Sequence, residues 1–240
     1  NKTLVYEAGK LYGDFLLRTS DLDPGKLTET IPHFHSMPFR YNQFDDAFKN
    51  AGNEALNLAK NEIDLILDSR KEMNELYELK VRNTFPIRIT HNDAKLSNIL
   101  FDKNCKGLAV IDLDTVMPGI IMYDFGDSVR SICALTREDD KDLLNTGINI
   151  EFYENFCKGF AKHTRAFITQ KEIEYLPLGA KTITFIMGLR FLTDFLNGNV
   201  YYKTAYETHN LDRARNQFKM VQSIKESFLE MQSITMEVFK

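Results

Sequence analysis

The sequence contains little cysteine and little histidine, and this limits the chemistry it can support. Its three cysteines, Cys105, Cys133 and Cys157, are odd in number and far apart. They predict neither a disulfide framework nor a zinc cluster, and they favour a reducing, cytoplasmic location. Only five histidines are present. A hydrolase that uses His91 and Asp93 with a metal is therefore disfavoured, because several further ligands would have to converge.

Long apolar runs and an excess of one charge are also lacking. No stretch approaches the roughly 18 uninterrupted apolar residues of a membrane-spanning helix, and we find no secretory leader pattern. Thirty Lys and Arg face thirty-four Asp and Glu, which gives a net charge of −4. We therefore expect neither a membrane nor nucleic acid among the partners. With 240 residues, 43% of them hydrophobic, the chain can bury a sizeable core.

Helical periodicity dominates the remainder. The stretch 31–46 mixes prolines, histidines and aromatic residues without a period, and it is predicted to be an ordered loop. Around position 100, by contrast, two short apolar runs flank turn chemistry at 102–107, which predicts a β-hairpin. The fold class is therefore mainly α with a small β-hairpin. Apolar spacing predicts helices over 4–15, 52–80, 124–135, 151–167, 173–196 and 210–231, and a short strand over 87–89.

The hairpin brings two oxygen-bearing side chains to one end. If residues 102–107 form the connection, the numbers of paired residues sum to about 209 and Asn98 faces Ile111, next to Asp112. Opposed residues on paired strands have Cβ atoms about 5 Å apart, and a bulge shifts this by one position. A carboxylate and an amide oxygen at this point suit Mg²⁺.

The loop before the hairpin has the spacing of a phosphotransferase. Asp93 precedes Asn98 by five residues, which matches the Asp-x-x-x-x-Asn spacing of kinase catalytic loops. Asp93 would orient the substrate hydroxyl or accept its proton, while Asn98 and Asp112 would bind the metal. Lys95 would place positive charge on the transferred phosphoryl group. Asp114 is expected to be a further metal ligand, or else to accept a hydrogen bond from a group that itself binds the metal.

Three nearby residues are predicted to support this loop. Asp124-Phe125-Gly126 spells the kinase metal triplet but lies beyond the strand end, so Asp112 is preferred as the ligand. Asp124 would instead cap the next helix or tie the catalytic loop by hydrogen bonds. Asp127, in the same first turn, suits the helix dipole, and His91 is expected to be a structural residue.

These motifs resemble the aminoglycoside phosphotransferase/choline kinase superfamily and, within it, the N-acetylhexosamine 1-kinase family. The resemblance spans nearly the whole chain, and segments outside the catalytic motifs point to the subfamily. It implies ATP- and Mg²⁺-dependent transfer to the anomeric hydroxyl of N-acetylglucosamine or N-acetylgalactosamine, for carbohydrate metabolism and amino-sugar salvage. The segments that carry it are 91–98, 110–119, 123–127, 189–202, 210–218 and 29–35.

The resemblance also suggests residues for the sugar site. Arg190 and Tyr202 are expected to contact the sugar, although an ion pair and simple packing are their respective alternatives. His33 and His35 are expected to line the same site or to form hydrogen bonds within their loop. A kinase for choline, an aminoglycoside or homoserine, and a non-catalytic kinase-like binding module, stay open as alternatives.

The sequence departs from the family in the residues expected to bind the nucleotide. Such kinases cover the phosphates with a loop of a small N-terminal lobe and pair them with a strand lysine, and neither feature precedes Asp93. We therefore expect residues 1–240 to form the C-terminal lobe of a protein-kinase-like fold, whose partner is an N-terminal lobe outside this chain. On its own, the chain is expected to show little turnover.

Overall fold

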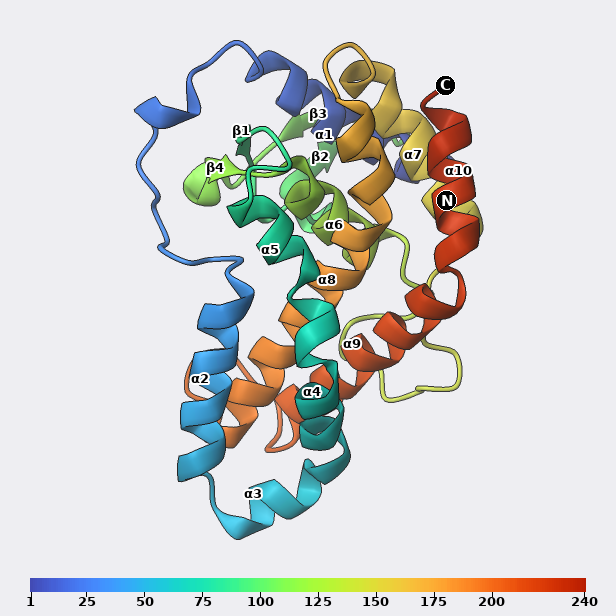
Figure 1. Ribbon diagram of the computed structural model, residues 1–240. Coiled ribbons are helices and arrows are strands. Elements are labelled where there is room, and N and C mark those ends of the chain that lie inside the picture. Colours follow the sequence, from blue (N-terminus) through green and yellow to red (C-terminus); the bar gives the residue numbers. More distant parts are fainter.

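The structure is a computed structural model that describes residues 1–240, and it is mainly helical with two small two-stranded sheets (Figure 1). Short 3-10 turns lie at Pro24–Lys26, Leu96–Asn98 and Leu113–Thr115. The helices are α1 (Lys2–Arg18), α2 (Met37–Asn50), α3 (Asn53–Leu58), α4 (Lys60–Met73), α5 (Glu75–Val81), α6 (Ile121–Ile132), α7 (Ile150–Thr164), α8 (Gln170–Leu196), α9 (His209–Glu226) and α10 (Phe228–Val238). The strands are β1 (Arg88–Thr90), β2 (Ile99–Phe101), β3 (Gly107–Val110) and β4 (Met117–Gly119).

Helix α8 forms the centre of the molecule. It is 27 residues long, is buried along most of its length and packs against α2, α6, α9 and α10, as Figure 1 shows for the long orange helix. Its first turn is closed by a capping box between Thr169 and Glu172. The Glu172 carboxylate also accepts hydrogen bonds from Nε and Nη2 of Arg88, both at 2.7 Å. This contact ties strand β1, which leads into the loop at 91–98, to the central helix.

Helices α6 and α8 cross at very short distance because glycines face each other. A Cβ atom on Gly126 would lie 2.4 Å from the carbonyl oxygen of Gly179, and one on Gly179 would lie 2.5 Å from that of Met122. Side chains at these positions would force the helices apart. The glycines therefore place α6, which carries Asp124 and Asp127, directly on the central helix.

The hairpin has the predicted register at the end next to Asn98. Ile99 pairs with Val110 and Leu100 with Ala109, and a bulge follows next to Phe101. Beyond the strands, the Ile111 N–H donates to the Asn98 carbonyl oxygen at 2.9 Å. Asn98 therefore does face Ile111, which confirms the prediction that Asp112 follows at the same end of the hairpin.

Several predicted elements differ from the structure. The stretch 31–46 is a loop only at its start, because Ser36 caps α2 and Pro38 occupies its first turn, where proline is tolerated. The helix predicted over 52–80 is three helices with breaks at Ala59 and Asn74. The helix predicted over 210–231 divides at Ser227. Strand β4, which pairs with β1, was not predicted.

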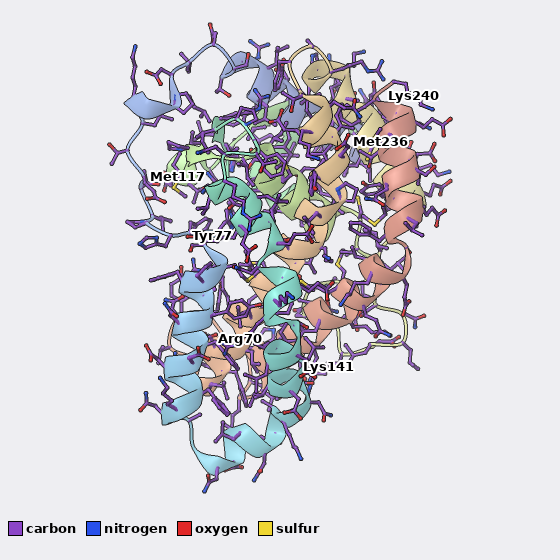
Figure 2. The ribbon with its side chains drawn as sticks, in the orientation of Figure 1. Arg70, Tyr77, Met117, Lys141, Met236 and Lys240 are labelled. Atoms are coloured by element: carbon purple, nitrogen blue, oxygen red, sulfur yellow. The ribbon has the colours of Figure 1, made fainter.

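The elements form an upper and a lower region, and helix α8 extends through both (Figure 1). Helices α1, α7 and α10 lie with the strands in the upper region, and α2, α3, α4 and α9 lie in the lower one (Figure 1). Figure 2 shows Arg70 of α4 beside α2, where Nη1 donates to Asp45 Oδ2 at 2.9 Å. All three cysteines are free thiols. None of the helices is both apolar enough and long enough to cross a membrane.

Candidate active site

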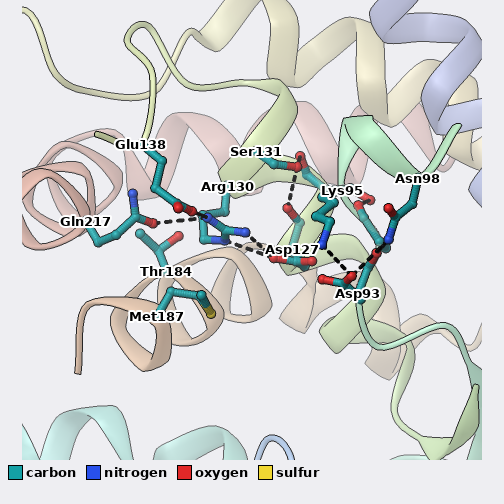
Figure 3. Close-up of polar contacts among 12 residues, drawn as sticks. Asp93, Lys95, Asn98, Asp127, Arg130, Ser131, Glu138, Thr184, Met187 and Gln217 are labelled. Carbon is teal, nitrogen blue, oxygen red and sulfur yellow. Dashed lines mark hydrogen bonds and ion pairs between the residues drawn. The ribbon is translucent and has the colours of Figure 1, made fainter. Parts of the chain in front are cut away.

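Asp93 lies at the centre of a small hydrogen-bonded group in the loop between β1 and β2. Its Oδ2 accepts from Lys95 Nζ at 2.6 Å and from Asn98 Nδ2 at 2.9 Å (Figure 3). The same Asn98 nitrogen donates to the Asp93 carbonyl oxygen at 2.9 Å. Neither Asp93 Oδ1 nor Asn98 Oδ1 has a hydrogen-bond partner in the chain. The group thus leaves one carboxylate oxygen and one amide oxygen available.

The environment of Asp93 keeps its carboxyl group ionised. Burial alone would raise its pKa, but the Lys95 ammonium and the Asn98 amide outweigh this and hold the pKa below its usual value. Asp93 is consequently a carboxylate at neutral pH. It is able to accept a hydrogen bond from a hydroxyl group.

Asp124 fixes the backbone of the catalytic loop. Its Oδ2 accepts from the His91 N–H at 2.8 Å and its Oδ1 from the Asn92 N–H at 2.7 Å. The carboxyl group is fully buried, and burial raises its pKa to about 6. Helix α6 starts three residues earlier and has no side-chain cap. Of the two roles expected for Asp124, therefore, it has the second: it ties the loop and does not cap the helix.

The His91 ring joins the loop to the end of the hairpin. Its Nδ1 accepts from the Asp93 N–H at 3.3 Å, so its Nε2 carries the proton that is donated to the Ile111 carbonyl oxygen at 3.0 Å. The ring packs edge-on against Tyr12 and Phe15. The His91 ring therefore links the Asp93 backbone to the residue before Asp112.

The two predicted metal ligands that follow the hairpin's second strand are exposed. Asp112 has a left-handed backbone (φ 64°, ψ 61°), and its carboxylate makes no hydrogen bond. Asp114 follows in the next turn, where only its carbonyl oxygen is engaged, by Thr30. No direct contact joins either carboxylate to Asn98.

The donor set nevertheless fits Mg²⁺. The structure contains no group of three His, Cys, Asp or Glu side chains able to hold a metal ion, which argues against a metal caged by protein alone. Mg²⁺ is commonly bound by one or two protein oxygens together with substrate phosphates. The free Asn98 amide oxygen and the unpaired Asp112 carboxylate, at the same end of the hairpin, are such a set.

A cleft of about 350 Å³ opens beside Asp93 and Lys95. On one wall, the buried Arg130 donates to Asp127 Oδ1 at 2.9 Å and to Glu138 Oε2 at 2.5 Å (Figure 3). Asp127 lies in the second turn of α6, so its expected place in the first turn was wrong. It is held by Arg130, three residues later, and burial raises its pKa despite that partner.

Arg190 and Tyr202 also line the cleft. The Arg190 guanidinium lies 5.3 Å from the Phe34 ring, 5.9 Å from that of Tyr201 and 5.6 Å from that of Tyr202. It forms no ion pair; its only polar contact is with the Met187 sulfur at 3.6 Å. The ion-pair alternative for Arg190 therefore does not apply, and cation–π contacts hold the side chain.

The hydroxyl of Tyr202 is buried and has no hydrogen-bond partner, while its ring packs on Phe191 at 4.8 Å between centroids. Buried hydroxyl groups are normally bonded. Because Tyr202 lines the cleft, its hydroxyl is a candidate for ligand contact as well as packing.

The two histidines of the loop before α2, His33 and His35, lie in different places. His35 is buried, lines the cleft and bonds through Nε2 to the Asn92 carbonyl oxygen at 3.0 Å. Burial lowers its pKa to about 3, so the ring is neutral. His33 is exposed and lines a separate pocket with Glu29 and Lys80. The structure thus brings His35, but not His33, to the cleft.

Sequence reasoning missed Asp194. Its carboxylate is buried and accepts from the backbone N–H groups of Val200 at 3.0 Å, Tyr201 at 2.8 Å and Tyr202 at 2.9 Å. Asn210 Nδ2 adds a fourth bond at 2.8 Å. Asp194 therefore holds the segment that carries both tyrosines. An aspartate shortly before the Asn-Gly-Asn turn at 197–199 was the available signal.

The chain was also compared with known families and structures. The family model described as phosphotransferase enzyme family (APH) matches residues 2–159. An ethanolamine kinase from Plasmodium vivax is similar in structure, with a TM-score of 0.56 and 16% identity over 87% of this chain. A choline kinase from Cryptosporidium parvum covers 100% of this chain, with a TM-score of 0.57 and 13% identity. The chain spans 58% of the first structure's length and 70% of the second's. These likenesses bear out the kinase-like fold.

Proposed function

Because the chain belongs to the APH phosphotransferase enzyme family, we propose that it transfers a phosphoryl group from ATP, with Mg²⁺, to a hydroxyl group of a small molecule. Our more specific proposal is that the acceptor is the anomeric hydroxyl of N-acetylglucosamine or N-acetylgalactosamine. The product is then the sugar 1-phosphate. The motif resemblance and the charges in the cleft support this choice.

The proposed mechanism uses the free oxygen of Asp93. The acceptor hydroxyl donates to Asp93 Oδ1 and is thereby aligned with the γ-phosphorus. As the oxygen–phosphorus bond forms and the bond to ADP breaks, the proton passes to Asp93. Lys95 neutralises part of the negative charge nearby. Asn98 and Asp112 would hold Mg²⁺, which supplies charge neutralisation at the phosphates when bound.

The single observation that carries the choice of acceptor is the pairing of charges in the cleft. Each of its three acids has a basic partner: Asp93 is paired with Lys95, and both Asp127 and Glu138 with Arg130. Arg190 and Arg213 line the same cleft, and neither forms an ion pair. A cationic amine would find no carboxylate there without a basic partner, whereas a neutral sugar offers oxygens to the free guanidinium groups. This favours a sugar over choline.

We further propose that the nucleotide is bound together with a lobe outside residues 1–240, since no glycine-rich phosphate loop precedes Asp93. Turnover is therefore to be compared between residues 1–240 alone and a longer polypeptide that also includes the proposed lobe. Residues 1–240 alone are expected to release little ADP, and normal turnover by them would contradict this expectation.

The test is a panel of acceptors with a coupled assay of ADP release. N-acetylhexosamines should be phosphorylated, and choline, ethanolamine, homoserine and aminoglycosides should not. Replacing Asp93 with Asn should lower kcat by about 100-fold or more, while Asp68→Asn, at an exposed site on α4, should not. Phosphorylation of choline without that of the sugars would refute the acceptor, and full activity of Asp93→Asn would refute the mechanism.

A further inference from the structure

A second cavity adjoins the cleft. It measures about 620 Å³ and lies between α2, the C-terminal part of α8 and the segment that follows α8. It does not contain Asp93 or any other residue of the catalytic loop. The residues that line both spaces are Ile31, Phe34, Arg190, Tyr201 and Tyr202.

Two guanidinium groups without a carboxylate partner line this cavity. Arg40 is 8% exposed and donates from Nε and Nη2 to the Phe34 carbonyl oxygen, at 3.2 and 2.6 Å, and from Nη1 to Gln43 Oε1 at 2.7 Å. These three contacts leave two of the five N–H groups of an arginine. Arg190 keeps four, since only its contact with the Met187 sulfur is formed.

The acids of the cavity do not neutralise these cations. Asp194 is occupied by its three backbone N–H donors and by Asn210. The Asp46 side chain is 79% exposed and lies 3.9 Å from Lys49. Arg40 and Arg190 therefore repel each other with little internal compensation, and this repulsion adds to burial in lowering the pKa of Arg40 to about 10. The buried hydroxyl of Tyr202, which also lines the cavity, is a further donor without a partner.

We propose that this second cavity binds an oxyanion, a carboxylate or a phosphate group, between Arg40 and Arg190. Planar guanidinium groups match such anions through paired hydrogen bonds. The cavity adjoins the cleft, so the anion is either the far end of an acceptor whose hydroxyl lies at Asp93 or a separate small ion. The first source rests on the proposed transfer at Asp93 but requires an acceptor that carries an anionic group, unlike the neutral sugars proposed above, whereas the binding of an anion does not depend on the proposed function.

The proposal is tested by calorimetry on residues 1–240 without nucleotide, at constant ionic strength. The probes are inorganic phosphate, acetate, N-acetylglucosamine and N-acetylglucosamine 6-phosphate. If the anion belongs to the acceptor, the sugar phosphate binds roughly tenfold or more tightly than the neutral sugar, because charge-assisted hydrogen bonds are stronger than neutral ones. If it is a separate ion, inorganic phosphate or acetate binds alongside the neutral sugar.

A substitution at Gln43 locates the site. Gln43 is exposed on α2, and its Oε1 already meets Arg40 Nη1 at 2.7 Å. Gln43→Glu therefore supplies a carboxylate to Arg40 without disturbing the core, and anion binding should weaken about tenfold or more. Lys49→Gln changes the net charge of the same helix equally, at a side chain outside the cavity, and should leave anion binding unchanged.

Two results would overturn the proposal. One is that neither inorganic phosphate, acetate nor the sugar phosphate binds through its anionic group to the unaltered chain. The other is that Gln43→Glu and Lys49→Gln bind the anions equally well, which places the anion elsewhere. Failure of the neutral sugar to bind, with anion binding intact, would count against the proposed function alone.

Discussion

Asn98 holds Asp93 at two points, because its Nδ2 donates at 2.9 Å to both the main-chain oxygen and the carboxylate Oδ2 of Asp93. Both contacts use the amide nitrogen, so they orient the amide oxygen away from Asp93. The residue proposed to bind the metal thus also sets the direction of the residue proposed to bind the acceptor. The two roles are coupled through one rigid amide group.

Asn98→Asp should therefore disturb Asp93, even though it keeps an oxygen that can bind the metal. A carboxylate at this site removes two donors and places a second negative charge beside Asp93, which raises the pKa of Asp93. We expect kcat to fall by about 100-fold or more, measured with saturating sugar and ATP. Asn104→Asp, the same change in the exposed hairpin turn, is the control. Near-normal turnover of Asn98→Asp would show that Asn98 is not needed for the reaction.

Asp194→Asn should loosen the wall of the proposed acceptor site. An amide cannot accept all four hydrogen bonds that the carboxylate receives, and its NH₂ group meets donors. The segment with Tyr201 and Tyr202 should become mobile, and KM for the sugar should rise about tenfold or more. The kcat and the KM for ATP should change little, which distinguishes positioning from general unfolding. Glu207→Gln, in the same segment, should leave all three constants unchanged.

His35 should make stability depend on pH in one direction. Its pKa is about 3 in the folded chain and 6.5 ordinarily, so between these values the unfolded chain binds a proton that the folded chain does not. The free energy of unfolding should fall as the pH is lowered from 6.5, by up to about 1.4 kcal/mol per pH unit from this residue. His35→Gln should flatten this slope in denaturant titrations at pH 7.5, 6 and 5. His163→Gln should not, and equal slopes in the two variants would contradict the assignment.

The pair between Arg88 and Glu172 should matter for stability and not for ligand affinity. The Glu172 side chain is fully buried and that of Arg88 is 15% exposed. Glu172→Gln leaves Arg88 without a counter-charge and weakens the capping box, so we expect a loss of about 3 kcal/mol or more in chemical denaturation. Glu174→Gln, which breaks an exposed pair with Lys171, should cost about 1 kcal/mol or less. Equal losses of stability in the two variants would show that the buried pair contributes no more than the exposed one.

The parts of the fold that could be predicted from sequence are those set by local chemistry. The turn at 102–107 determines which residues of the hairpin meet, so the register of Asn98 and Ile111 followed directly. Strand β4 could not be predicted, because Met117-Pro118-Gly119 has no strand pattern and is extended only through pairing with β1. Helix α2 was missed because its proline, Pro38, and its aromatic residues obscure the helical period that begins after the cap at Ser36.

The same division applies to the candidate site. Asp93, Lys95 and Asn98 lie within six residues, so their spacing alone predicted a joint role. Glu138 reaches the cleft only because Arg130 binds it there. The function of Asp194 depends on the path of the chain six to eight residues later. Contacts of this kind depend on tertiary folding and leave little trace in the local sequence.

Asp112 stands in a backbone conformation that glycine adopts more readily than any residue with a side chain. Selection for stability alone would therefore replace it with glycine. Such a replacement would raise the free energy of unfolding by about 1 kcal/mol. It would also remove the carboxylate at the hairpin's end. At this position, stability favours glycine, whereas the proposed metal-binding role requires the aspartate.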